Sequence, residues 1–345
     1  MITVVIIAIV IALLFDFLNG MNDAANSIAT IVSTKVLSPT MAVLWAAFWN
    51  FAAYFFFGIT VANTMGKGIV DPAVVNEYVI LSALIGAVIW VWTCTHFGMP
   101  ISVSHALIGG LIGPVLFGMG PQFLIGSGIA KIALFIILSP LIGMTLGFFM
   151  MCLTMLVFKK QHPMKVEGIF KKMQLFSSAI FSLGHGGNDA QKTMGIIAIL
   201  LFSVSQTHPD NAFISFLFDG KQGFHVPEWL IFTCYGTIAL GTITGGWKVI
   251  RTLGDGLARL KPVQGFCAET AGALTLIGTG LAGIPVSTTH TVTGSIIGTG
   301  ITKGVASVRW ATAKNIVWAW LLTIPAAMLV SGLVYLLLQW IVPGL

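Results

Sequence analysis

The chain has 345 residues, of which 57% are hydrophobic and only 8% are charged. An ordinary soluble domain carries roughly 25% charged residues. This composition therefore excludes an ordinary soluble domain. The formal net charge of +6 could suggest a nucleic-acid partner, but the basic residues lie in short loops between apolar segments. Membrane topology explains that placement better. We therefore predict an integral membrane protein that is surrounded by the lipid bilayer and has no nucleic-acid partner.

Apolar runs of about 20 residues recur along the whole chain, and each is long enough to cross a hydrocarbon core of roughly 30 Å as a helix. Helices are expected because they satisfy their own backbone hydrogen bonds in lipid. The first run has no basic start and no small-residue cleavage site, so we interpret it as a span and not as a signal peptide. The expected spans are 1–34, 41–62, 79–97, 98–117, 129–158, 176–205, 229–248, 263–282, 283–301 and 312–341.

The densest run of charge is KKQHPMKVEGIFKKMQ, residues 159–174, which contains five lysines. We expect a solvated loop there, on the cytoplasmic face of the cell inner membrane, because cytoplasmic loops are enriched in lysine and arginine. Counting spans outward from this loop places 63–78 and 206–228 outside. It also divides the chain into a first repeat (1–158), a basic linker (159–175) and a second repeat (176–345).

Two motifs occur once in each half of the chain. GMNDAANS (20–27) matches GGNDAQKT (186–193), and GMPISVSHALIGGLIG (98–113) matches GIPVSTTHTVTGSIIG (283–298). Each half has five apolar segments, an odd number, so the second copy must enter the membrane in the opposite sense. We therefore predict an all-α polytopic bundle of two inverted-topology repeats, with its substrate and ion sites near the bilayer midplane.

The sequence does not decide how the second motif crosses the membrane. Residues 79–117 and 263–301 are each either two full spans or a re-entrant hairpin with its tip at the centre. Either choice leaves each pair starting and ending on one face.

The first motif places polar residues inside the first expected span. Asp16, Asn19, Asp23 and Asn26 follow a spacing that puts them on one helical stripe. A carboxylate inside a membrane costs at least about 2.5–3.5 kcal/mol on insertion scales, so such a stripe is a functional candidate, facing a cavity, a cation or a proton. The alternative is a buried polar cluster that holds helices together.

Glycines stand directly before both Asn-Asp pairs, at Gly20, Gly186 and Gly187. We expect them to break the helix and free backbone groups that line a cavity. Carboxylate, amide and freed backbone oxygens are hard ligands, which suit a small hard cation such as Na⁺.

The second motif has the opposite chemistry. Pro100 and Pro285 are expected to interrupt a helix, and hydroxyl residues follow each of them. A restarting helix presents a hydroxyl cap and unsatisfied N–H groups, which together form an anion site. Two such half-helices could surround a tetrahedral oxyanion. The alternative is close helix packing through small residues.

Serine and histidine together raise the alternative of an intramembrane enzyme. Ser104 and His105 are sequence neighbours and so point apart on a helix, and the pattern occurs twice, whereas a nucleophile and its base are needed once. We therefore predict no enzyme activity.

Glu269 is the remaining acid in an apolar segment, and its counterpart in the first half is Leu84. Burial in a medium of low dielectric constant favours a protonated carboxyl group, so Glu269 is a candidate proton carrier or third-site cation ligand. A pair with Lys192 is the alternative explanation.

Together the motifs look like those of the inorganic phosphate transporter (PiT) family. GMNDAANS is similar to the family signature GANDVANA, HGGNDAQKTMG to its second-half counterpart, and GIPVSTTH to the second signature. The resemblance implies a symporter that imports inorganic phosphate with Na⁺ or H⁺ by alternating access, as a transport domain moves against a scaffold. A sulfate or other oxyanion permease on the same fold and an ion channel are the alternatives.

Carried onto this chain, the resemblance assigns roles to single residues. The cation site, which would bind Na⁺ as a metal ion under sodium coupling, would include Asp23, Asn26 and Asp189. The phosphate site would include Ser102, Ser104, Ser287, Thr288 and Thr289. Asn22 and Asn188 are ion-site residues by the resemblance, and we also expect them to bind phosphate. Our remaining candidates for cation binding or coupling are Asp16, Asn19, Glu269 and Lys192.

One position departs from the signature. The second half has Lys192, after Gln191, where the first half has Asn26. The lysine brings its own positive charge, so it could replace a bound Na⁺ or attract the anion. The QK form resembles bacterial members regarded as proton-coupled or as carriers of neutral metal–phosphate complexes. The coupling ion is therefore left open between Na⁺ and H⁺, no other cofactor is expected, and a homodimer remains an open alternative.

Overall fold

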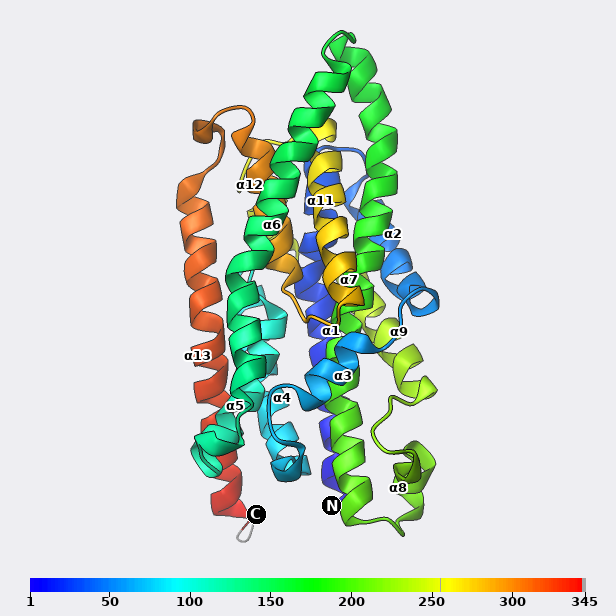
Figure 1. The fold of residues 1–345 in the computed structure, drawn as a ribbon, viewed down its shortest axis with the longest axis vertical. Helices are drawn as coiled ribbons and strands as arrows, with labels where there is room; N and C mark the ends of the chain where they lie inside the picture. The colour runs from blue at the N-terminus through cyan, green and yellow to red at the C-terminus, as the bar shows by residue number, and fades with distance from the viewer. Residues whose placement is uncertain (255, 343–345) are drawn as a thin grey trace.

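The structure, a computed structural model, describes residues 1–254 and 256–342, and in these ranges the chain forms helices and no strand. The membrane helices run nearly parallel to the long axis of the molecule (Figure 1). The α-helices are α1 (Ile2–Ser33), α2 (Pro39–Ala52), α3 (Thr60–Lys67), α4 (Glu77–Phe97), α5 (Val103–Gly118), α6 (Gly126–Phe158), α7 (Pro163–Thr207), α8 (Ala212–Leu217), α9 (Glu228–Thr244), α10 (Trp247–Gly254), α11 (Pro262–Leu281), α12 (Thr288–Ile301) and α13 (Trp310–Ile341).

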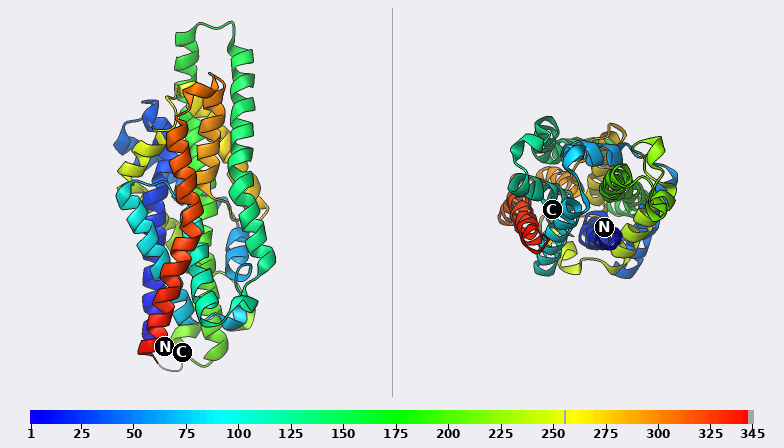
Figure 2. Two further views of the ribbon diagram at one scale, coloured as in Figure 1. Left: turned by 90° about the vertical axis from the view of Figure 1, so that its left-hand side faces the viewer. Right: turned by 90° about the horizontal axis from the view of Figure 1, so that it is seen from below.

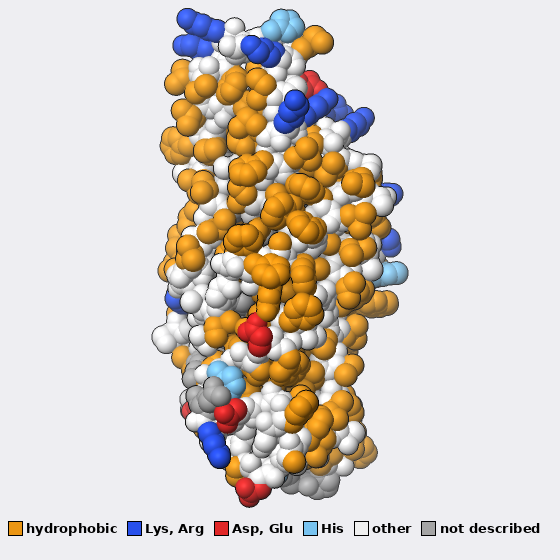
Figure 3. Space-filling model, turned by 90° about the vertical axis from the view of Figure 1, so that its right-hand side faces the viewer, with side chains coloured by type: hydrophobic (Ala, Val, Ile, Leu, Met, Phe, Trp, Pro, Cys, Tyr) orange, Lys and Arg blue, Asp and Glu red, His pale blue; other side chains and the backbone are white. Residues whose placement is uncertain are grey.

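The bundle is built to lie in a bilayer. Within the described ranges, α1, α4, α6 and α13 are each long and apolar enough to span a membrane, and two bent helix pairs could add two more spans. Large apolar side chains are exposed on the long helices, among them Phe149 on α6 and Leu337 on α13. Figure 3 shows hydrophobic side chains spread over most of one face. A soluble monomer rarely exposes so wide an apolar surface, so the protein is a multi-pass membrane protein.

Two expected spans are bent. Residues 41–62 form no single straight helix, because α2 gives way to a 3₁₀ turn (Ala53–Phe55) and α3 leaves at 87°. Residues 229–248 divide into α9 and α10, which meet at 75°. Gly245 between them has φ +64°, a left-handed conformation that ends a helix and favours glycine.

The lysine-rich segment 159–174 is mostly helical, which corrects the expectation of a loop. After a short turn, α7 begins at Pro163, a favoured first position because proline lacks the N–H that would be unsatisfied there. The hairpin of α6 and α7 therefore projects beyond the other helices (Figures 1 and 2). Lysine and arginine side chains gather at this end, whereas most acidic side chains visible on the same face lie in the lower half (Figure 3).

The α4–α5 and α11–α12 pairs form two hairpins that enter from opposite ends of the molecule. Their tips meet about halfway along it (Figure 1). The tips are joined directly, because the Thr289 hydroxyl donates to the Ile101 carbonyl oxygen at 2.9 Å. Each hairpin packs against the long helix of the other half: α5 against α13, and α12 against α6. Residues 79–117 and 263–301 therefore each start and end at one end of the molecule.

The two halves pack on one another crosswise. Helix α1 contacts α9 and α10 of the second half, and α7 contacts α2 and α3 of the first half. Helices α1 and α7 also contact each other at the centre and run in opposite directions (Figure 1). The two Asn-Asp pairs therefore face a common interior.

Candidate functional site

Helices α1 and α7 pass through the centre without a break, so the expectation that glycine interrupts them is wrong. The glycines allow neighbouring backbones to approach instead. A Cβ atom on Gly20 would lie 2.1 Å from the Ile238 carbonyl oxygen in α9, and one on Gly186 would lie 2.4 Å from the Asn50 carbonyl oxygen in α2. Both distances are far below van der Waals contact, so any larger residue would push the helices apart.

The hairpin tips end in capped helices, as the second motif predicts. Ser102 is the N-cap of α5, and its hydroxyl oxygen accepts a hydrogen bond from the His105 backbone N–H at 3.2 Å. Ser287 caps α12 in the same way, accepting from the His290 N–H at 3.2 Å. The hydroxyl oxygen of each cap is thus engaged by its own helix, while its hydrogen stays available for donation.

The carboxylate of α1 meets neutral donors from the second hairpin. Asp23 lies within hydrogen-bonding distance of the hydroxyls of Thr288, at 3.2 Å, and Thr289, at 3.4 Å. The Thr289 hydroxyl is closer to the Ile101 carbonyl oxygen, at 2.9 Å. The Asn26 amide donates to the same two threonine oxygens, at 3.1 and 3.0 Å. All four side chains are buried. The tip of the second hairpin is thereby attached to the first motif.

The carboxylate of α7 meets a positive charge. The Lys192 ammonium lies 2.5 Å from Asp189 Oδ1 and also donates to the Ser104 hydroxyl at 2.6 Å and the Val286 carbonyl oxygen at 2.8 Å. Three acceptors match the three donors of an ammonium, so this buried lysine is fully satisfied. Thr288 donates to the other oxygen of Asp189 at 3.1 Å. Lys192 thus connects the second copy of the Asn-Asp motif to the tip of the first hairpin.

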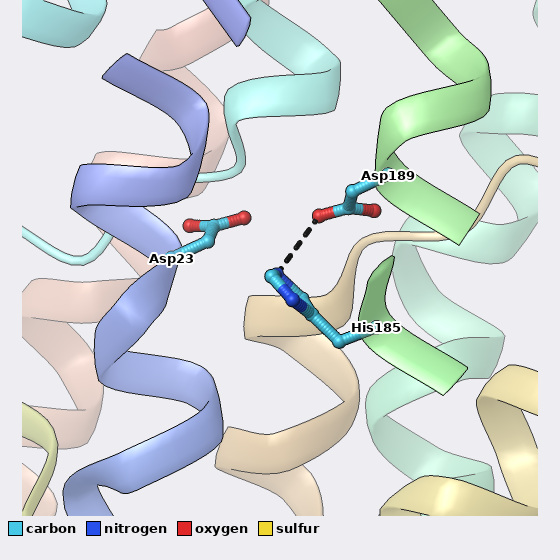
Figure 4. Close-up of side chains that lie close together, drawn as sticks. All are labelled: Asp23, His185 and Asp189. Atoms are coloured by element: carbon cyan, nitrogen blue, oxygen red, sulfur yellow. Dashed lines mark ion pairs between the residues drawn. The ribbon is translucent and has the colours of Figure 1, made fainter. Parts of the chain in front are cut away.

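His185 is a central residue that our sequence reasoning missed. Its Nε2 lies 3.3 Å from Asp189 Oδ2, and its Nδ1 lies 3.1 Å from the Asn50 Oδ1. Figure 4 shows Asp23, His185 and Asp189 pointing toward one another, and one ligand atom from each lies within 4.8 Å of the others. The signal was in the sequence, because a residue four positions before Asp189 faces the same side of a helix. Two carboxylates beside an imidazole could hold a cation.

Asp16 and Asn19 continue the stripe toward the start of α1, and no hydrogen bond joins them to Asp23 within the described part of the chain. Asp16 Oδ1 accepts from the Thr193 hydroxyl at 2.8 Å. Asp16 Oδ2 and Asn19 Oδ1 are buried and find no hydrogen-bond partner in residues 1–254 and 256–342. The four residues of the stripe therefore lie on one face of α1, but Asp16 contacts α7 whereas Asp23 and Asn26 contact the second hairpin.

The two asparagines before the aspartates have free hydrogen-bonding capacity. Asn22 donates to the Thr95 hydroxyl at 2.7 Å, while its carbonyl oxygen has no partner among the described residues. Neither polar atom of the buried Asn188 amide has one there. Buried polar groups are normally paired, so unsatisfied amides beside paired carboxylates indicate a place where a polar ligand binds.

Glu269 lies in a separate polar cluster, which corrects the alternative that it pairs with Lys192. Oε1 accepts from Thr30 at 2.6 Å and Gln174 at 2.9 Å, and Oε2 accepts from Ser177 at 2.5 Å. The residue is fully buried yet has three donors, so it is not unpartnered as the sequence suggested. Thr30 is one helical turn beyond Asn26, which places this cluster next along the inner face of α1.

A membrane-embedded bundle whose opposed hairpin tips enclose carboxylates, amides, hydroxyls and one ammonium defines a membrane transport protein. A model of the Phosphate transporter family matches residues 19–166 and 157–331. The chain belongs to this family, which consists of transporters and not of enzymes.

Individual relatives agree with this assignment. The chain is 51% identical to a Rhizobium meliloti protein described as a probable low-affinity inorganic phosphate transporter, over 85% of this chain and 84% of the relative. A Bacillus subtilis protein with the same description is 37% identical over 87% of this chain and 86% of its own length. A solved structure described as the sodium-dependent phosphate transporter superposes with a TM-score of 0.88 at 27% identity, covering 99% of this chain and all of the other.

Proposed function

We propose that the protein is a symporter of the cell inner membrane that imports inorganic phosphate together with Na⁺ or H⁺. The observation that carries this proposal is the meeting of two capped half-helices at a buried group of carboxylates and unsatisfied amides. The names of the relatives support phosphate as the substrate, and the name of the solved structure supports coupling to sodium.

Phosphate binds between the two hairpin tips in this proposal. The first turns of α5 and α12 present backbone N–H groups, which favour an anion. The hydroxyls that donate come from Ser102, Ser104, Ser287, Thr288 and Thr289, and the amides beside them are Asn22 and Asn188. Lys192 already donates to Ser104, so its charge lies next to the expected anion. Hydroxyl, amide and backbone N–H donors can then surround the phosphate oxygens, with the charge of Lys192 beside them.

Asp23 selects phosphate over sulfate in this arrangement. Hydrogen phosphate carries a P–OH group that can donate to a carboxylate, whereas fully ionised sulfate has no donor. The donors that approach Asp23 from the second hairpin are neutral hydroxyls, so it retains acceptor capacity, whereas Asp189 is engaged by Lys192. Asp23 is therefore the better acceptor of the two.

The coupling cation binds next to Asp23 and Asn26, with Asp189 opposite. Carboxylate and amide oxygens suit Na⁺, and a shared proton between the carboxylates is the alternative. Lys192 supplies a fixed charge where the repeated motif would bind a second ion. Asp16 and Asn19 on one side of the centre, and Glu269 on the other, are candidate coupling residues along the path of the ion.

Alternating access follows from two inverted repeats, 1–158 and 176–345, joined by the linker 159–175. The crosswise contacts of α1 and α7, and the exchange of hairpin partners between α6 and α13, support this division. The two hairpins are then re-entrant, with their tips at the midplane. Rocking of the motif helices and hairpins against the remaining helices would expose the site to each side in turn.

Radiolabelled phosphate uptake into proteoliposomes tests the proposal when Na⁺ and pH gradients are imposed separately. We expect one of the two gradients to drive accumulation. Uptake that ignores both gradients would refute symport, and uncoupled ion conductance would select a channel. Sulfate uptake that phosphate does not compete with would select an oxyanion permease.

Two finer predictions, transport of a metal–phosphate complex and formation of a homodimer, have their own tests. Uptake measured with and without Mg²⁺ tests whether phosphate enters as a neutral metal complex. Light scattering of the protein in detergent tests the homodimer.

A further inference from the structure

A groove of about 300 Å³ opens at the lysine-rich end of the molecule, away from the central site. The end of α6, the start of α7 and the start of α11 form its walls. Apolar side chains line one part, among them Met151, Met155 and Phe158, and polar groups line another, among them Gln161 and Lys261. The groove is therefore amphipathic at the position where a membrane meets water.

An apolar cavity of about 230 Å³ continues along the same two helices. On α7, Val166 lines the first cavity, and Met173 and Ile180 line the second. On α11, Val263 lines the first, and Thr270 and Ile277 line the second. Both sets repeat every seven residues, so the two cavities follow one face of each helix.

The length of this face matches one leaflet of a bilayer. Fourteen helical residues rise about 21 Å, which covers a head group and half of a hydrocarbon core of roughly 30 Å. Edge-to-face aromatic contacts connect the two cavities: the ring centroids of Phe158 and Phe170 are 5.1 Å apart, and those of Phe170 and Phe266 are 5.3 Å apart. The exposed side chains of Phe176 and Leu274 border the inner cavity on the outer surface.

The outer end of the groove carries positive charge without matching acids. Lys261 lines the groove at the start of α11. Lys303, in the turn after α12, lies near Lys261, and its ammonium donates to the Gln264 Oε1 at 2.6 Å. Neither lysine forms an ion pair within residues 1–254 and 256–342. Partial burial, followed by the nearby Lys261 charge, lowers the pKa of the Lys303 ammonium. The one acid in the lining, Glu167, is paired with Lys171 at 3.1 Å. An anion placed here would relieve the repulsion between the two lysines.

We propose that this groove binds a phospholipid with an anionic head group, whose phosphate lies against Lys261 and Lys303 and whose acyl chain follows the α7–α11 face. A basic pocket between helices at the cytoplasmic surface is a known chemical match for such a head group. Free phosphate would use the lysines but leave the apolar cavity unexplained. The lipid would hold the start of α11, the helix that carries Glu269.

The test uses the full chain purified in detergent, with native mass spectrometry to measure binding of phosphatidylglycerol and phosphatidylcholine that have identical acyl chains. We expect phosphatidylglycerol to bind more tightly. Lys261→Gln and Lys303→Gln should each weaken it about fivefold, the effect of one lysine near an anionic lipid, and leave phosphatidylcholine unchanged. Leu274→Trp, which narrows the acyl cavity, should weaken both lipids.

Lys314→Gln is the matched control, since Lys314 is an exposed lysine on α13 outside the groove. Circular dichroism confirms that each variant is folded. Equal binding of the two lipids, or binding that neither Lys261→Gln nor Lys303→Gln weakens, would overturn the proposal. Displacement of phosphatidylglycerol by inorganic phosphate, together with no effect of Leu274→Trp, would assign the lysines to free phosphate. These results are independent of the central transport site, so either proposal can fail alone.

Discussion

Helices α1 and α7 carry the same Asn-Asp pair at the centre of the molecule, yet they surround its carboxylates with different chemistry. Asp23 in α1 is approached by the neutral hydroxyls of Thr288 and Thr289. Asp189 in α7 receives the Lys192 ammonium and the His185 imidazole as well. The comparison teaches that the copy of the motif in α7 has a positive charge of its own, the Lys192 ammonium. The copy in α1 keeps oxygen ligands that an ion from solution could use.

The largest expected effect on stability and uptake comes from removing the carboxylate of the Asp189–Lys192 ion pair. Asp189→Asn leaves the Lys192 ammonium buried without a negative partner, and breaking a buried pair in this way costs about 3–5 kcal/mol. We expect a clearly lower thermal unfolding midpoint in detergent and loss of phosphate uptake. The double variant Asp189→Asn/Lys192→Gln should recover much of the stability. A double variant as unstable as the single one would contradict the pairing.

The matching change in α1 should separate function from stability. Asp23→Asn removes a charge but strands no cation, and its amide oxygen can still accept from Thr288 and Thr289. We expect a stability loss of no more than about 1 kcal/mol, the net value of a hydrogen bond, while coupled uptake falls to background. Near-normal uptake by this folded variant would refute the assignment of Asp23 to the ion and substrate site.

Lys192→Asn tests the comparison directly, because it gives α7 the residue that α1 has at Asn26. We expect uptake to become more strongly dependent on Na⁺, measured as the ratio of initial rates with and without an imposed sodium gradient. Lys314→Asn is the control for loss of one lysine. An unchanged ratio in the Lys192 variant would show that the lysine does not stand in for a bound ion.

The last prediction concerns the packing of α1 against α9. Gly20→Ala should cost about 1–3 kcal/mol, because its Cβ atom would overlap the Ile238 carbonyl oxygen. Gly278→Ala is the matched control, since nothing lies within 4 Å of an added Cβ there. It should be neutral or stabilise the protein by up to about 1 kcal/mol, as alanine is the better helix former. Equal unfolding midpoints for the two variants would contradict the close approach of α1 and α9.

Patterns local in sequence were predicted well. The stripe on α1, the caps at Ser102 and Ser287, and the halt in the helix before each cap follow from spacing and from the hydrogen-bonding needs of a helix end. Features that depend on residues far away in the sequence were not predicted. Whether Gly20 breaks a helix or admits a neighbour depends on Ile238, more than two hundred residues away, and the sequence does not show that proximity.

The same reasoning explains the two residues whose surroundings were missed. His185 matters because it lies between Asn50 and Asp189, and only one of these is near in sequence. Glu269 looked isolated because its donors, Thr30, Gln174 and Ser177, come from two other helices. A polar residue in an apolar segment indicates a site, but its role depends on partners that only the fold brings together.

The Thr288 hydroxyl lies within hydrogen-bonding distance of both central carboxylates, 3.2 Å from Asp23 and 3.1 Å from Asp189. A hydroxyl has a single hydrogen, so at any instant it can serve one aspartate or the other. Rotation of this hydroxyl about the threonine Cα–Cβ and Cβ–Oγ1 bonds would move its hydrogen bond from Asp189, which has Lys192 as a charged partner, to Asp23. The two copies of the motif are thus linked by an uncharged side chain that can donate to either aspartate from a similar distance.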